Sequence, residues 1–323
     1  MVAHPAHHAL ADVADCLSII GARRRARPID HVAWLPLQYE FLSDSSPIKQ
    51  IRAGNQFVGK TWAALAEVIG RCLGRHPLGL GVPPPPITAW VVCAEWSQSL
   101  GIQEKLAELL PWDEVDPRTS YDAVNGFSPT KRPCIKFRNG SRIWIKTTKQ
   151  DAISFAGATI DVVLFDEPPK AQRTFVEALQ RIQERSGVLL LSYTPVNAPT
   201  DYLRELVEAG TISDHWRRIT PAELIPVGRT LPLRTRNGRL KDQAYIDHRR
   251  SLTPEYEQPV VIDGEWEFRG DGAYFDGAWD PAKHVFRARL EKWDHLVLGI
   301  DHGDRPGKQV AVLMELKARF DEE

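Results

Sequence analysis

Two short stretches of this sequence carry the side chains that phosphoryl transfer requires. Residues 54–61 read GNQFVGKT, of the form G-x-x-x-x-G-K-[ST], and residues 162–167 read VVLFDE. In the first form, backbone N–H groups surround phosphates, the lysine reaches the β and γ oxygens, and the hydroxyl binds Mg²⁺. The second is an apolar strand that ends in two carboxylates, one to hold the metal and one to handle the attacking water. Together the two stretches predict a site that binds and hydrolyses ATP with Mg²⁺.

The chemistry of each residue suggests its role. We expect Lys60 to bind phosphate oxygens, and we expect Thr61 and Asp166 to hold Mg²⁺, the latter through water. Glu167 would orient and deprotonate the attacking water. The predicted nucleotide-binding residues of the loop are Gly54, Asn55, Gln56, Gly59, Lys60 and Thr61. The plainer alternatives are a solvated lysine at a helix start and an acidic strand end before a turn, and the presence of both motifs disfavours them.

The two carboxylates are adjacent, which sets a geometric requirement. Neighbouring side chains on a strand point to opposite faces of a sheet. Both can reach one nucleotide only if the strand ends there and the chain turns. Pro168 and Pro169, which follow directly, indicate such a turn.

Strands and helices alternate through the first two hundred residues. A short strand from Ile48 leads into the phosphate loop, and apolar runs predict buried strands at 87–93, 160–165 and 187–192. Helices are predicted at 61–73, 97–110 and 173–185. An Asn-Gly pair predicts a β-hairpin over 135–147. This order predicts an α/β fold of the RecA-like P-loop NTPase class, with a doubly wound, mainly parallel sheet covered by helices on both faces.

Shifts in composition divide the chain into four segments. We expect a leader over 1–30, an ATPase domain over 31–210, a lid or linker subdomain over 211–284, and the start of a further domain over 285–323. A new apolar strand, which ends at Asp301, marks the last segment.

The net charge, the cysteine content and the length of the apolar runs exclude several classes of protein. The chain has 323 residues, a formal net charge of −1 and four cysteines. None of these cysteines forms a C-x-x-C pair, so a disulfide framework or a structural zinc site is not expected. No apolar run approaches the roughly 20 residues that span a bilayer, and the N-terminus lacks the apolar core of a signal peptide. We expect a soluble intracellular protein with no membrane partner.

Several motifs, in their order, resemble the large terminase subunits of tailed bacteriophages, the ATPase–nuclease motors that package DNA. The motifs are residues 36–41 (PLQYEF), 52–56 (RAGNQ), 139–143 (NGSRI), 155–157 (FAG), 192–195 (SYTP), 264–266 (GEW) and 299–303 (GIDHG). The resemblance covers about residues 34–313. Many motor ATPases share the phosphate loop and the acidic pair, whereas the ordered set of the other motifs is more specific.

The resemblance implies further site residues and partners. Gln38 would contact adenine, and Ser192 and Thr194 would sense the γ-phosphate and link hydrolysis to motion. Asp301 would be the first metal ligand of an RNase H-like nuclease. The implied partners are double-stranded DNA, the small terminase subunit and the portal protein. The chain would be a monomer alone and a homo-oligomeric ring when assembled, in the cytoplasm of the bacterial host.

The nuclease that the family carries is expected to be largely missing. A two-metal nuclease needs several carboxylates from different strands around ions roughly 3.5–4 Å apart. Only residues 302–323 follow Asp301, and four of their five acids lie in the polar tail from Glu315 onward. We therefore predict no DNA cleavage by this chain.

Arginines should neutralise charge on the transferring phosphoryl group. Arg52, just before the phosphate loop, is one candidate, and Arg138 and Arg142 on the hairpin are candidates for a neighbouring subunit's nucleotide. Each could instead form a surface salt bridge. The densest basic segment could touch DNA phosphates or could be a solvated lid; it contains Arg217, Arg218, Arg234, Arg236 and Arg239.

Two alternative functions share part of this pattern. A superfamily-2-like DNA helicase or translocase also has a glutamine segment and an acidic pair. It normally carries a second RecA-like domain, for which the residues after 200 leave no room. A nucleotide-binding switch without turnover would not need Glu167. The motor of a DNA-packaging terminase is therefore the preferred interpretation.

Overall fold

The computed structural model describes residues 26–129, 132–149, 159–196, 201–266, 295–301 and 310–316, with isolated positions between 16 and 22. The chain divides into two compact units, Met1–Asp271 and Gly272–Glu323. The phosphate loop and the acidic pair both belong to the first unit.

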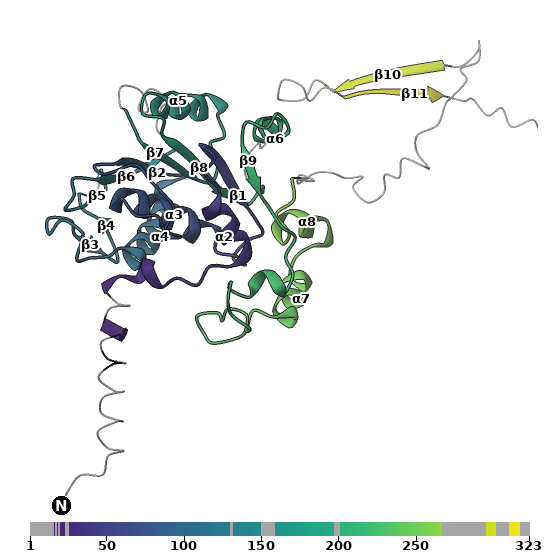
Figure 1. Ribbon diagram of the computed structural model, residues 1–323. Coiled ribbons are helices and arrows are strands. Elements are labelled where there is room, and N and C mark those ends of the chain that lie inside the picture. Colours follow the sequence, from purple (N-terminus) through teal and green to yellow (C-terminus); the bar gives the residue numbers. More distant parts are fainter. Residues whose placement is uncertain are drawn as a thin grey trace, which may run out of the picture. The chain divides into compact units, whose positions relative to one another are not determined.

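The first unit is built on a seven-stranded sheet with the strand order β5-β6-β2-β7-β8-β1-β9 (Figure 1). Its strands are β1 (Ile48–Arg52), β2 (Thr88–Cys93), β5 (Cys134–Lys136), β6 (Arg142–Thr147), β7 (Val162–Asp166), β8 (Val188–Tyr193) and β9 (Ser213–His215). All neighbours are parallel except β5 and β6, which form the predicted antiparallel hairpin. The predicted mainly parallel α/β sheet is confirmed.

Helices cover both faces of this sheet (Figure 1). On one face lie α2 (Pro36–Ser43), α3 (Lys60–Leu73) and α4 (Trp96–Leu109), and on the other lie α5 (Gln172–Gln183) and α6 (Asp201–Glu208). Because side chains alternate along a strand, β7 sends Leu164 into the first core and Phe165 into the second. Burial on both faces explains why these strands read as near-continuous apolar runs.

The chain after β8 returns to the same sheet. β9 pairs with β1 at the sheet edge, and η3 (Ala222–Leu224), α7 (Gln243–Ser251), η4 (Glu255–Glu257) and α8 (Gln258–Val261) follow. Other short elements are η1 (Pro28–His31), β3 (Tyr121–Asp122) and β4 (Gly126–Phe127). The sequence did not predict these short elements, because so few residues show little periodicity. Among the helices that the structure describes, none is long and apolar enough to cross a bilayer.

The described part of the second unit is an antiparallel ribbon of β10 (His295–Asp301) and β11 (Val310–Leu316). The strand predicted to end at Asp301 is therefore confirmed. The segment boundaries at residues 210 and 284 stay predictions. Beyond the first of them, β9 still pairs within the sheet of the first unit.

Candidate active site

The two predicted motifs meet at one edge of the sheet. Asp166 ends β7 beside Ser192 of β8, and the next residue of β8 lies beside Arg52 of β1. The phosphate loop follows β1 at this edge. From the start of α3, Thr61 Oγ1 donates a hydrogen bond of 2.9 Å to Asp166 Oδ1. The hydroxyl and the carboxylate that would share one metal ion are therefore in contact.

The phosphate loop turns sharply into α3. Gly59 has a φ of +59°, and its carbonyl accepts a hydrogen bond of 3.0 Å from Trp62 N in the first turn. Gln56 is also in the left-handed region, with a φ of +63°. Glycine adopts such a φ at little cost, whereas other residues are strained by it. The loop thus ends at the N-terminus of a helix, where free N–H groups favour phosphate.

Lys60 lies at the start of this helix with only 9 % of its surface exposed. Burial lowers the pKa of its ammonium, while the nearby carboxylates of Glu167 and then Asp166 act in the opposite direction. One ammonium and two carboxylates thus form a single electrostatic cluster at the helix N-terminus. Such a cluster suits a metal-bound triphosphate.

Gln38 connects α2 to the phosphate loop. Its Nε2 donates to Gly59 O at 2.8 Å, and its Oε1 accepts from Leu35 N at 2.9 Å. One N–H and one lone pair of the amide remain after these bonds. They match a ring nitrogen and the amino group of adenine, so the contact of Gln38 with adenine stays a prediction that this placement allows.

Glu167 meets the geometric requirement set by two adjacent carboxylates. It has a φ of +72°, and its N–H donates to Ser192 O at 2.9 Å. The strand therefore ends at Asp166, and the turn at Glu167 brings the second carboxylate within electrostatic reach of Lys60. A left-handed backbone at a residue other than glycine costs about 1–3 kcal/mol and is typical of functional sites.

The carboxyl of Glu167 titrates near neutrality. Burial raises its pKa to about 7, and the neighbouring Asp166 also raises it. Lys60 and a backbone hydrogen bond from Thr194 act in the opposite direction. A carboxyl with a pKa near the working pH is suited to general base catalysis.

Lys105 on α4 acts on the same site, and the sequence did not predict it. Burial raises the pKa of Asp166, and the largest opposing effect comes from the Lys105 ammonium. Lys105 also lowers the pKa of Lys60. It follows the buried Ile102 by three residues, so it lies toward the packed side of α4. A single lysine within a helix gives no sequence signal that separates it from solvated lysines.

The predicted coupling residues contact both motifs. Thr194 Oγ1 donates to Ala53 O at 2.9 Å and lies 3.1 Å from Asn55 Oδ1. Ser192 is fully buried beside Asp166, and its hydroxyl has no well-aligned partner among the described residues. Ser192 at the end of β8 therefore lies beside the acidic strand, and Thr194, just after β8, contacts the phosphate loop.

The segment after β9 packs on the phosphate loop. Asn55 N donates to Val261 O at 2.8 Å, and Lys241 Nζ donates to two loop carbonyls at 3.1 and 3.2 Å. A Cβ atom at Gly54 would lie 1.8 Å from Ile262 O. The first glycine of the motif is thus required by the close approach of another backbone segment.

Arg52 contacts protein groups instead of pointing into the nucleotide site. Its Nε and Nη2 donate to the carboxylate of Asp214 at 2.9–3.0 Å, and its Nη1 donates to Gly264 O at 2.8 Å. The guanidinium carbon lies 4.8 Å from the ring centroid of Trp216 and 4.5 Å from that of Trp266. All three nitrogens are engaged, so a catalytic role would require these bonds to break.

The other two candidate arginines lie away from the phosphate loop. Arg142 begins β6 and lies beside Thr88, the first residue of β2, in the strand register. This end of the strands is opposite to the edge that carries the phosphate loop. Arg138 lies in the turn between β5 and β6, and both arginines are exposed. They remain candidates for the site of a neighbouring copy.

The basic segment predicted to touch DNA is partly neutralised within the fold. Arg217 forms an ion pair with Glu40, and Arg218 forms one with Glu265 at 2.6 Å. Arg234 donates to a backbone carbonyl at 2.8 Å. These side chains are still exposed at the surface, so contact with DNA stays a prediction.

The described ribbon of the second unit does not gather carboxylates. Asp301 lies opposite Val310, whereas Glu315, the other acid in these two strands, lies opposite Leu296 at the far end. The role of Asp301 as a metal ligand stays a prediction. The predicted motif at 155–157 and residues 302–303 of the last motif lie outside the described residues.

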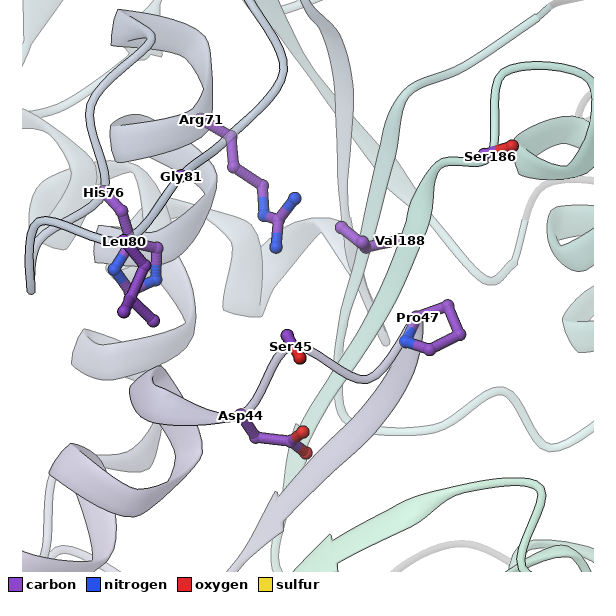
Figure 2. Close-up of a pocket in the computed structure, with 9 residues that line it drawn as sticks. All are labelled: Asp44, Ser45, Pro47, Arg71, His76, Leu80, Gly81, Ser186 and Val188. Atoms are coloured by element: carbon purple, nitrogen blue, oxygen red, sulfur yellow. The ribbon is translucent and has the colours of Figure 1, made fainter.

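A separate pocket of about 230 Å³ lies at the opposite edge of the sheet (Figure 2). Pro47, just before β1, and Val188, at the start of β8, line it together with Arg71 and His76. The predicted phosphate loop follows the carboxyl end of β1, and the predicted coupling residues lie at the carboxyl end of β8, so this pocket is distinct from the candidate active site.

The sequence matches a known protein family. Residues 51–280, more than half of the chain, match the N-terminal part of the large terminase subunit of the T4-like virus type. The chain belongs to this family. No curated protein sequence matches this terminase chain.

A solved terminase structure shares the fold. The large terminase of a thermophilic bacteriophage aligns with a TM-score of 0.50 and 13 % identity, over 84 % of this terminase and 62 % of that chain. The complex of the same phage terminase with ADP gives a TM-score of 0.47 and 14 % identity, over 88 % and 65 % of the two chains. The ATPase domain of the Thermus phage P74-26 large terminase aligns with a TM-score of 0.43 and 17 % identity, over 72 % of this terminase and 93 % of that chain. This terminase chain thus spans less than two thirds of the length of the thermophilic phage terminase in both of its structures.

Proposed function

We propose that this terminase chain is the ATP-hydrolysing motor that moves double-stranded DNA into a procapsid. The observation that carries the proposal is the hydrogen bond of 2.9 Å between Thr61 and Asp166, which joins the phosphate loop to the acidic strand. Lys60 and Glu167 share the same electrostatic cluster. Membership of the terminase family supplies the packaging context.

The donor atoms at this contact fit Mg²⁺. Thr61 Oγ1 and Asp166 Oδ1 are hard oxygen ligands, and Mg²⁺ at nucleotide sites combines one or two such ligands with phosphate oxygens and waters. When bound, the ion would neutralise charge on the β- and γ-phosphates. Lys60 and the loop that ends at Gly59 would bind the phosphate oxygens of ATP.

Glu167 is the general base in this proposal. It accepts a proton from a water whose oxygen forms the new bond to the γ-phosphorus, while the bond to the bridging oxygen breaks and ADP leaves. In this proposal Ser192 and Thr194 register the loss of the γ-phosphate; the supporting observation is that Ser192 lies beside Asp166 and Thr194 contacts Asn55. The segment that contacts the loop through Val261 would move in response.

The remaining parts of the motor follow from this assignment. We assign Arg52 to the anchoring of the motif at 264–266, and we propose that Arg138 or Arg142 serves the nucleotide of a neighbouring copy in an assembled ring. The exposed arginines after β9 would contact DNA phosphates without reading sequence. The partners would be the portal protein and the small terminase subunit in the host cytoplasm.

ATP turnover with and without duplex DNA tests this function. We expect DNA to stimulate hydrolysis when the chain is assembled on portal-bearing procapsids, and we expect the stimulation to decrease as salt rises. Arg236→Ala should weaken the stimulation, whereas Arg118→Ala, an exposed arginine that pairs with Asp116 outside this segment, serves as a matched control. Hydrolysis that DNA never stimulates under assembly conditions would contradict the packaging role.

A further inference from the structure

Helix α2 is fastened to its neighbours at both ends. At its N-terminal end, Gln38 donates to Gly59 O at 2.8 Å. At its C-terminal end, the ammonium of Lys49 donates to Phe41 O and Asp44 O, each at 2.7 Å. The last carbonyls of a helix lack partners within the helix, and a cation beside them also complements the helix dipole. Lys49 therefore caps α2.

The same ammonium contacts the phosphate-loop helix. Lys49 Nζ lies 2.7 Å from Glu67 Oε2, and neither side chain is exposed. Glu67 Oε1 accepts from Arg71 Nε and Nη2 at 3.0 and 2.8 Å. Figure 2 shows the Arg71 guanidinium extending into the pocket that Asp44, the residue directly after α2, also lines. Glu67 lies seven residues after Lys60 on α3, so the contact joins the end of α2 to the helix that carries the phosphate loop.

This charge network does more than hold two helices together. A buried ion pair is a weak source of stability, because lost hydration offsets much of the attraction. Apolar side chains already hold α2, which buries Leu37, Phe41 and Leu42. Lys49 donates hydrogen bonds to the end of α2, and its ion pair with Glu67 holds that end beside one turn of α3.

We propose that Lys49 and Glu67 are positioning residues of the nucleotide site, which set the placement of Gln38 against the phosphate loop and thereby the preference for adenine. Helix α2 has eight residues and is about 12 Å long. A shift at its C-terminal end therefore reaches Gln38. The inference rests on the proposed ATP hydrolysis and on the contact of Gln38 with the base.

Lys49→Met tests the inference with little new charge imbalance, because Glu67 keeps Arg71 as its partner. Two quantities are measured in the full chain: kcat/KM for ATP and GTP, and hydrogen–deuterium exchange of residues 36–43. We expect the ATP:GTP ratio of kcat/KM to fall about fivefold, the effect of one hydrogen bond, and exchange in α2 to become faster. In a Gln38→Ala background, Lys49→Met should leave the ratio unchanged, because it acts through Gln38.

Val91→Ala is the matched control. Val91 is fully buried in β2, which is not among the main neighbours of α2, so the variant loses stability while Lys49 and Glu67 stay intact. Its ATP:GTP ratio should equal that of the wild type. Glu67→Gln, which keeps the side-chain volume, should lower the ratio in the same direction and provides a second variant if Lys49→Met does not fold.

The possible failures are distinguishable. Unchanged exchange of residues 36–43 in both Lys49→Met and Glu67→Gln would overturn the inference, whether or not the chain hydrolyses ATP. An ATP:GTP ratio that Gln38→Ala does not alter would overturn the role of Gln38 in the proposed function and the link from Lys49 to adenine. A wild type without ATP turnover would overturn the proposed function, and the exchange measurement would still decide whether Lys49 and Glu67 hold α2 in place.

Discussion

Thr61 of α3 and Asp166 of β7 are 105 residues apart in the chain, and a hydrogen bond of 2.9 Å joins them. The bond places a hydroxyl and a carboxylate at the end of two different elements on one edge of the sheet. Oxygen ligands of this kind are what Mg²⁺ prefers. The position of the metal in the proposed motor therefore depends on this pair.

Thr61→Val removes the hydroxyl and keeps the shape of the side chain. We expect the Mg²⁺ concentration for half-maximal ATP turnover to rise about tenfold or more, because one metal ligand is lost. Thr61→Ser keeps the hydroxyl and should stay close to the wild type. Equal Mg²⁺ dependence in Thr61→Val and Thr61→Ser would show that the hydroxyl does not hold the metal.

Glu167 should give ATP hydrolysis a pH dependence near neutrality. Its pKa is raised to about 7, and a general base must be ionised, so kcat/KM should rise as pH increases through this value. The quantity to measure is kcat/KM at saturating Mg²⁺ across about pH 5 to 9, since it reports the free enzyme. Glu167→Gln should lose this titration together with most of its turnover. A wild-type profile that is flat across this range would contradict the assignment.

The backbone at Glu167 should be strained in the folded state. Glu167 has a φ of +72°, which glycine adopts more easily than alanine. The Glu167→Gly variant should therefore be more stable than Glu167→Ala by about 1 kcal/mol. Both variants lack the carboxyl, so the comparison isolates the backbone. Denaturant unfolding measures the difference. The same pair at Glu177, in the middle of α5, should show the opposite order, because glycine weakens a helix.

Arg52 and Asp214 should behave as a structural pair. Arg52→Met leaves the largely buried carboxylate of Asp214 without its main partner and should lower the free energy of unfolding by roughly 3–5 kcal/mol. The double variant Arg52→Met/Asp214→Leu should regain much of this stability, and ATP turnover should recover with it. Turnover that stays down by about 10³ in a stable double variant would instead show that Arg52 acts on the phosphoryl group.

The sequence predicted the parts of the fold with strong local patterns. Apolar strands such as β7 and β8 and the periodic helix α3 lie within a few residues of their predicted positions. The Asn-Gly turn predicted the hairpin of β5 and β6 because only a few backbone conformations suit that pair. Short helices such as α2 were missed, since eight residues show little periodicity.

The candidate site was predictable where a motif encodes its geometry. The spacing around Lys60 and the strand end at Asp166 indicated that the two would meet. The partners of Arg52 could not be predicted, because Asp214 lies 162 residues away and ion pairing leaves no local pattern. Lys105 was missed for the same reason, since its effect depends on how α4 packs.

ATP binding and ATP turnover, measured together for the wild type, Lys60→Ala and Glu167→Gln, test the central claim most directly. We predict that Glu167→Gln binds Mg²⁺–ATP about as tightly as the wild type but turns it over about 10²–10⁴ times more slowly. Lys60→Ala should lose both binding and turnover, because the phosphates lose their main cation. Both variants hydrolysing ATP at the wild-type rate would contradict the claim that the phosphate loop and the acidic pair form one catalytic site.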